Sequence, residues 1–240
     1  MIKPSSAPGS TPSLAHPGSA EPRGNFFSGS RTSPREAAEK LHKLALDHLN
    51  DAKGRRTARL YRIFVYDAPP AAWKGHTPLG KKSLDLAQSP TAQWRHEFHE
   101  ALRGLRKVAL RMGEIPTGQV RWQLKAEVLK ELTNGKRRWE DLTDDDFRLD
   151  LRQKGVDMRL GLDIASLAYK QQVNQIVLIS GDADFVPAAK LARREGIDFI
   201  LDPMWATIRP DLYEHIDGLR TVCPRPVKKP EGDGAAEGAA

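Results

Sequence analysis

The sequence predicts an α/β fold with a mainly parallel sheet and helices on both of its faces. Residues 175–180 (QIVLIS) form a short apolar run of the kind that parallel sheets bury. A helical pattern follows, with Pro187 in its first turn and Gly196 just after its end. A second apolar strand covers residues 198–202 and ends before Pro203. Strand, helix and strand at this spacing form a βαβ unit, which requires a parallel sheet.

The elements before this unit alternate in a similar way. Apolar residues recur with a helical period over residues 37–49 and predict an amphipathic helix. Residues 61–66 are typical of a buried strand, which ends at Asp67 and the proline pair that follows. A basic loop is expected over residues 71–90.

The middle of the chain is expected to add further helices. An apolar stripe from Trp94 to Ala109 predicts a second helix with arginines on its other faces. Residues 120–132 (VRWQLKAEVLKEL) fit a strand, a helix or both. The apolar positions of residues 160–168 predict a helix before the strand at residues 175–180.

Length and composition limit the number of domains and the setting. The 240 residues allow one substantial domain or two small ones. We expect a disordered segment at residues 1–34, a folded domain at residues 35–223 and a disordered tail at residues 224–240, because both ends are rich in small residues, proline and charge. No apolar stretch is long enough to span a membrane or to act as a secretory signal. Cys223 is the only cysteine, which excludes an intrachain disulfide and favours a reducing, cytoplasmic setting.

The net charge is +7 and the sequence pI is near 9.5, which favours a polyanionic partner. The alternative is an ordinary basic soluble protein. Association into homo-oligomers stays open.

Acidic residues gather around the expected carboxyl edge of the sheet, where ligands bind in open α/β folds. Some follow predicted strands and others belong to the helix before the strand at residues 175–180. They are Asp67, Asp157, Asp163, Asp182, Asp184 and Asp202. Carboxylates that converge on one crevice repel each other unless a cation lies among them. Mg²⁺ suits such a site, and its water ligands supply a nucleophile for phosphodiester hydrolysis.

Each of these acids also has a structural interpretation. Asp184 could cap the helix that follows it, and Asp163 could be a solvated residue or half of an ion pair. Asp67 and Asp202 could shape turns beside prolines. Asp182 comes directly after a glycine and has the weakest structural explanation, so it is the best single candidate for a metal ligand.

Residues 154–197 closely resemble the NYN domain family, PIN-like ribonuclease relatives that include the LabA-like proteins. The resemblance rests on K-G-V-D at residues 154–157, a second aspartate at Asp163, and S-G-D-A-D-F at residues 180–185. Its wider extent is about residues 60–222. It implies a PIN-like, Rossmann-like three-layer α/β/α sandwich that cleaves RNA, with single-stranded RNA as the expected partner and Mg²⁺ or Mn²⁺ as the cofactor.

The resemblance also implies roles for individual residues. Asp157, Asp182 and Asp184 match the family's catalytic, metal-binding acids, and Asp163 matches a further acidic position that we include among the metal ligands.

The expected substrate-binding residues lie in or beside the matching motifs. Lys154 and Arg159 are candidate phosphate contacts, although Lys154 could instead pair with Asp157 across one helical turn. Ser180 and Asn25 complete this set.

One part of the family pattern is missing or degraded. Members open with an apolar strand that ends in D-G-x-N, and its Asp is a central metal ligand. Here Asn25 matches the Asn, but Pro22 stands where the Asp is expected and no apolar strand precedes it. The chain is either a diverged, inactive member or carries a first stretch from a wrong start or reading frame. In both cases we expect weak or absent catalysis, because even an outer-shell partner of a metal is worth about 10–100-fold.

Basic and aromatic residues alternate in two places, as in sites for single-stranded nucleic acid. Trp73 lies beside Lys74, His76, Lys81 and Lys82, and Trp139 follows Lys136, Arg137 and Arg138. The alternative is that the tryptophans are core residues and the charges form a solvated surface.

Three functions follow: a metal-dependent ribonuclease, a non-catalytic RNA-binding or scaffolding protein, and a small-molecule phosphohydrolase. The third rests on the likeness of D-A-D to the D-x-D motif of haloacid-dehalogenase-like phosphatases, and it is the weakest because their nucleophile follows the first strand. The chain lacks the glycine-rich and nucleophile-elbow motifs of ATPases, dehydrogenases and serine hydrolases.

Overall fold

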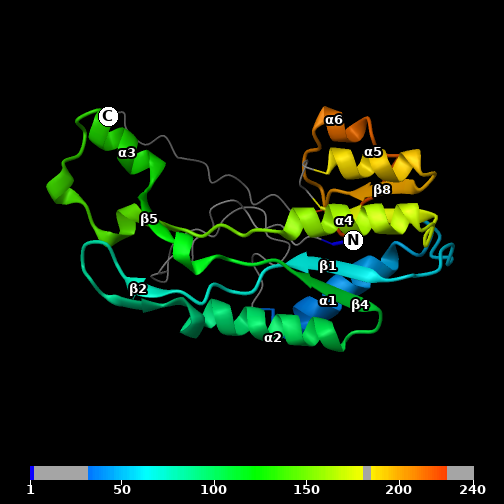
Figure 1. Cartoon of the computed structure of the whole chain (residues 1–240), viewed down its shortest axis with the longest axis horizontal. Helices are drawn as coiled ribbons and strands as arrows, with labels where there is room; N and C mark the ends of the chain where they lie inside the picture. Colours follow the sequence, from blue (N-terminus) through cyan, green and yellow to red (C-terminus); the bar gives the residue numbers. More distant parts are fainter. Residues whose placement is uncertain (3–31, 181–184, 226–240) are drawn as a thin grey trace, which may run out of the picture.

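The computed structural model describes residues 1–2, 32–180 and 185–225, which form a mixed α/β fold with a mainly parallel sheet (Figure 1). The sheet has two groups of parallel strands. In one group β1 pairs with β4, and in the other β7 pairs with β8 and β8 pairs with β9. The strands are β1 (Ile63–Asp67), β4 (Val108–Met112), β7 (Gln175–Ile179), β8 (Asp198–Asp202) and β9 (Gly218–Leu219).

The first two residues join the two halves of the sheet. Ile2 forms parallel bridges with both Val65 of β1 and Ile179 of β7. Its N–H donates to the carbonyl of Phe64 at 2.8 Å, and its carbonyl accepts from the N–H of Tyr66 at 2.9 Å. The place of the missing central strand is therefore occupied over two residues. This differs from the expectation that the whole of residues 1–34 is disordered.

Helices cover both faces of the sheet, as the sequence predicts. α1 (Pro34–Asp47) and α2 (Pro90–Gly104) lie on one face, and α4 (Val156–Tyr169) and α5 (Val186–Arg194) lie on the other (Figure 1). A capping box between Ser33 and Glu36 fixes the start of α1. The short α6 (Pro210–Tyr213) precedes β9. Among the described residues, no helix is long and apolar enough to cross a membrane.

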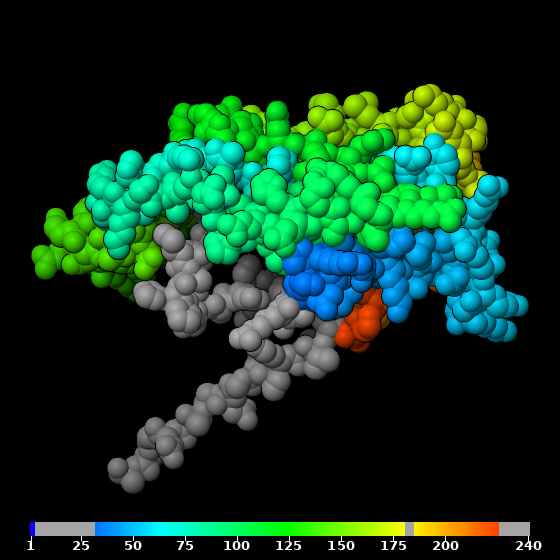
Figure 2. Space-filling model, turned by 90° about the horizontal axis from the view of Figure 1, so that it is seen from below, coloured from blue at the N-terminus to red at the C-terminus, as the bar shows by residue number. Residues whose placement is uncertain are grey.

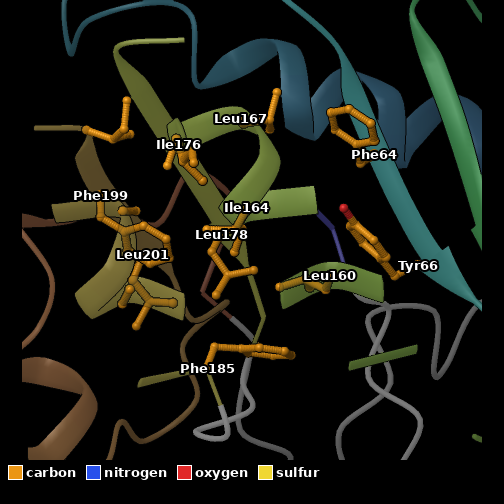
Figure 3. Close-up of a cluster of buried hydrophobic side chains, with 14 of the residues drawn as sticks. Phe64, Tyr66, Leu160, Ile164, Leu167, Ile176, Leu178, Phe185, Phe199 and Leu201 are labelled. Atoms are coloured by element: carbon orange, nitrogen blue, oxygen red, sulfur yellow. The ribbon is translucent and has the colours of Figure 1, made fainter. Parts of the chain in front are cut away.

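Apolar side chains form a separate core on each face of the sheet. The first core joins Phe64 and Tyr66 of β1 to α4, β7, α5 and β8 (Figure 3). The second core joins Val65 and Ile179 to the apolar sides of α1 and α2. Alternate residues of β1 thus point to opposite cores, so this strand is buried on both faces.

A second lobe extends from the carboxyl edge of the sheet along the long axis of the molecule (Figures 1 and 2). Its first part follows β1 and contains the hairpin of β2 (Lys74–His76) and β3 (Ser83–Asp85). Its second part follows β4 and contains the antiparallel pair β5 (Arg121–Leu124) and β6 (Phe147–Asp150), with α3 (Ala126–Thr133) between them. Short 3₁₀ turns lie at Leu86–Gln88, Thr117–Gln119, Trp139–Asp141 and Asp144–Asp146.

Several sequence predictions are confirmed and others are wrong. The segment 120–132 contains a strand followed by a helix, which was one of its predicted alternatives. The helix expected from Trp94 to Ala109 ends at Gly104, because residues 108–112 form β4. The expected basic loop at residues 71–90 contains the β2–β3 hairpin.

Candidate functional site

The start of α4 lies at the carboxyl edge of the sheet and carries the K-G-V-D motif. Gly155 precedes the helix at φ +80°, a left-handed conformation that suits glycine. Lys154 exchanges two backbone hydrogen bonds with Glu114, at 2.8 and 3.1 Å. These bonds tie the start of α4 to the segment that follows β4. Asp157 lies in the first turn of the helix and is exposed.

The second motif is anchored at both of its ends beside α4. The N–H of Ser180 donates to the carbonyl of Asp202 at 3.0 Å, and Ser180 is buried. Phe185 is also buried and packs in one cluster with Val156 and Leu160 of α4 (Figure 3). Asp182 and Asp184 lie outside the described residues, so their predicted roles stay predictions.

Asp163 forms the ion pair that was one of its alternative interpretations. Its Oδ2 atom accepts from Arg111 Nε at 2.8 Å and from the Tyr66 hydroxyl at 2.9 Å. Arg111 also lies over the ring of Phe64, 5.1 Å from its centroid. Burial, followed by the charge of Asp163, raises the pKa of Tyr66, so this hydroxyl stays protonated and donates.

Asp163 does not lie beside Asp157. Six residues along a helix correspond to about 9 Å along the axis and to a turn of about 120° around it. The two carboxylates therefore lie on different faces of α4. A metal ion at Asp163 would also have to displace or tolerate the guanidinium of Arg111.

Asp67, at the end of β1, is neutralised by residues of α2. Its carboxylate accepts from Arg95 at 2.5 Å and from His99 Nε2 at 2.9 Å, and a third bond comes from the N–H of Ala68. Asp67 and His99 are both buried. The side chains of Arg95 and His99 thus already occupy both oxygens of this carboxylate.

Asp202, at the end of β8, is bound in a similar way from α1. Its carboxylate accepts from His48 Nε2 at 2.9 Å and from the N–H groups of Met204 and Val222. Burial opposes ionisation of this fully buried carboxyl, but the hydrogen bonds outweigh burial and hold the pKa of Asp202 below its usual range.

The remaining acids have the chemistry of a magnesium or manganese site. Asp157, Asp182 and Asp184 supply only carboxylate oxygens, the donors that Mg²⁺ and Mn²⁺ prefer. The buried histidines His48 and His99 are each hydrogen-bonded to an aspartate. No group of three or more potential metal ligands occurs within residues 1–2, 32–180 and 185–225.

The predicted substrate contacts differ in their surroundings. Lys154 and Arg159 are exposed at the start of α4, where a phosphate could reach them. Ser180 is only 2% exposed, which leaves little of its side chain for a substrate. Asn25 lies outside the described residues.

The two basic and aromatic segments have different environments. Trp73 packs edge-on against Trp122, with ring centroids 6.4 Å apart, and Lys74 pairs with Asp85. Trp73 and Lys74 therefore take part in packing and ion pairing within the protein, as in the alternative interpretation of this segment. Trp139 in the second lobe is instead 67% exposed.

The basic neighbours of Trp139 differ from one another. Lys136 and Arg138 are exposed, whereas Arg137 pairs with Asp146 at 2.6 Å. The surface around Trp139 therefore keeps two basic side chains that a polyanion could reach.

Sequence reasoning missed the basic partners of the buried aspartates. Arg95 and His99 are four residues apart and so share one face of α2, which is a detectable signal. No comparable local pattern indicates the pairing of Arg111 or His48 with its acid.

Comparisons with known proteins support one family. The sequence model of the NYN domain matches residues 124–207, which are 84 of the 240 residues. The matched range contains both the K-G-V-D motif and the S-G-D-A-D-F motif. NYN domains are a family of PIN-like nucleases. A search of curated proteins and a search of solved structures each found no match. Residues 124–207 are therefore similar to the NYN domain family, and the α/β fold of the chain is compatible with that family.

Proposed function

We propose that this protein binds single-stranded RNA at the carboxyl edge of the sheet and cleaves its phosphodiester bonds weakly, with Mg²⁺ or Mn²⁺. The proposal is supported chiefly by the buried cluster that Phe185 shares with Val156 and Leu160, because one cluster then holds residues from both family motifs. The net charge of +7 agrees with a polyanionic substrate.

In this proposal Asp157, Asp182 and Asp184 hold the metal ion. The ion would supply an activated water and neutralise charge on the phosphate. Lys154 and Arg159 would bind the phosphates on either side of the scissile bond. Asp163 would influence the site only after release from Arg111, so we rank it below the other three acids.

A second function, RNA binding without catalysis, is favoured by a separate observation. Three of the candidate acids, Asp67, Asp163 and Asp202, already have basic partners from the protein. Fewer carboxylates are then available to hold a metal ion. The exposed Trp139 and its basic neighbours would still bind single strands.

An RNA cleavage assay with the full chain distinguishes these functions. We expect slow cleavage of a labelled single-stranded RNA that requires Mn²⁺ or Mg²⁺, stops on chelation and is lost in Asp182→Asn. The control Glu39→Gln removes the same charge from an exposed position of α1 and should cleave normally. Salt-sensitive RNA binding without any cleavage would support the second function. Cleavage that persists in Asp182→Asn would contradict the proposed site.

We also infer a reducing, cytoplasmic setting. The inference rests on Cys223, which is the only cysteine of the chain and is not part of a disulfide.

A further inference from the structure

The turn that follows β8 has a strained backbone. Met204 and Trp205 are consecutive residues with positive φ, +50° and +67°. The N–H of Ala206 donates to the carbonyl of Pro203 at 2.9 Å, which closes a turn around them. Two positive φ values at the centre of a hydrogen-bonded turn are the mark of type I′, which normally takes Asn and Gly at these positions. Bulky residues cost more there, and strain of this kind gathers at active sites and ligand-binding sites.

This turn lies at the carboxyl edge of the sheet, beside the second family motif. β8 ends at Asp202, and the carbonyl of Asp202 accepts from the N–H of Ser180, the first residue of S-G-D-A-D-F. The carboxylate of Asp202 also accepts from the N–H of Met204 at 2.8 Å, which joins the turn to the end of the strand. Trp205 therefore follows the edge of the candidate site by three residues.

The indole ring of Trp205 is held in one orientation but stays accessible. Its Nε1–H donates to the carbonyl of Cys223 at 2.9 Å. The guanidinium of Arg225 lies over the ring, 5.5 Å from its centroid. The residue is nevertheless 48% exposed. An exposed ring that is already oriented loses little conformational freedom on binding, which favours a stacking partner.

Arg225 adds a cation beside this ring. It is exposed, and it makes no ion pair within residues 1–2, 32–180 and 185–225. Sites for single-stranded nucleic acid combine aromatic rings, on which bases stack, with cations that bind the backbone phosphates. Trp205 and Arg225 supply one group of each kind.

We propose that Trp205 binds the substrate through a base: one base of the single-stranded RNA stacks on its ring, while Arg225 binds an adjacent phosphate. This inference rests on the proposed RNA function and adds a base contact to a site whose other proposed residues bind only phosphates and the metal ion. The alternative is a structural role, in which Trp205 only anchors the segment around Cys223.

The test compares binding of two ligands to the full chain in EDTA: oligo(U), and an oligomer of the same length that lacks the bases. Asn tolerates positive φ, so Trp205→Asn keeps the turn and removes the ring. We expect Trp205→Asn to weaken binding of oligo(U) by about 5–150-fold, and binding of the abasic oligomer by less than about twofold. Trp205→Tyr keeps an aromatic ring and should retain most of the affinity. The control Tyr213→Asn removes an exposed ring from α6 and should bind both oligomers normally.

The salt dependence of binding separates the ring from the cation. Each phosphate contact with a single strand contributes about 0.7 to the slope of log K against log salt. Arg225→Gln should therefore reduce the slope by about 0.7 with either oligomer, whereas Trp205→Asn should leave the slope unchanged.

The outcomes distinguish this inference from the function on which it rests. A native chain that binds neither oligomer would overturn both. Binding of oligo(U) that Trp205→Asn leaves unchanged would overturn the inference alone, and so would equal losses with the two oligomers, which indicate a structural role. If Trp205→Asn does not fold, ultraviolet cross-linking of oligo(U) to the native chain decides. A cross-link at Trp205 would support the inference, and cross-links at other residues only would overturn it.

Discussion

The partly buried amino group of Met1 should make the stability of the protein depend on pH between about 5 and 8. The pKa of this group is 8.0 when unperturbed and about 5 in the folded protein, because burial disfavours the charged form. Between these values the unfolded chain binds a proton that the folded chain does not. The free energy of unfolding therefore rises with pH across this window and levels off on either side.

The magnitude follows from the difference between the two pKa values. A difference of about 3 units, from 8.0 to about 5, corresponds to about 4 kcal/mol at 1.36 kcal/mol per unit. A cavity of about 920 Å³ lies beside Met1, and other titratable side chains that line it affect the absolute curve: Arg59, Arg62, Lys107, His48 and Asp198. The measurement is thus a comparison of the native chain with a chain acetylated at Met1, which cannot take up this proton.

Urea unfolding of both chains at pH 5, 6, 7 and 8 provides the assay. We expect the two free energies of unfolding to be similar at pH 8 and to separate progressively as the pH falls, with the acetylated chain more stable by up to about 4 kcal/mol near pH 5. Equal pH dependence of the two chains would refute the reasoning, because it would mean that the amino group of Met1 is solvated in the folded protein.

Three substitutions test other parts of the structure. Asp202→Asn should lower the free energy of unfolding by about 1–3 kcal/mol, because it removes the charged acceptor of the hydrogen bonds from His48, Met204 and Val222. Denaturant unfolding measures this loss, and an unchanged free energy of unfolding would contradict the role of these bonds. Trp139→Ala should weaken binding of single-stranded RNA by about 5–150-fold in fluorescence anisotropy, since a stacked base contributes about 1–3 kcal/mol. The control Tyr213→Ala removes another exposed aromatic ring and should leave affinity unchanged; equal losses in the two would exclude a specific role for Trp139. Leu178 is fully buried in the sheet core, so Leu178→Ala should lower the free energy of unfolding by about 2–5 kcal/mol. A smaller loss in thermal unfolding would show that the core relaxes into the space left by the leucine side chain.

The C-terminal half of the fold could be predicted well from the sequence. β7, α5 and β8 follow each other closely, and Pro187 and Gly196 mark the ends of the helix between them. β4 could not be predicted, because Ala109 also fits the helical period of α2. All residues of β4 are half-buried, so the strand carries no alternation of apolar and polar side chains that would separate it from the helix.

The candidate site was predictable only in part. The family motifs indicate which acids to consider, but they do not reveal which acids already have partners. The partner of Asp202 is His48, 154 residues earlier, and the partner of Asp163 is Arg111, 52 residues earlier. Such pairs arise only when the sheet brings distant segments together. The insertion of Ile2 into the sheet was equally inaccessible, because two residues are too few to show a period.

The second lobe is connected to the sheet by two separate insertions, one after β1 and one after β4 (Figure 1). Asp144 of the later insertion accepts hydrogen bonds from the backbone N–H groups of Leu79 and Gly80 in the earlier one. These hydrogen bonds link the two insertions, so a movement of one insertion away from the other would have to break them. An RNA strand bound at the carboxyl edge, as proposed above, would lie beside a lobe whose two insertions are joined by these hydrogen bonds.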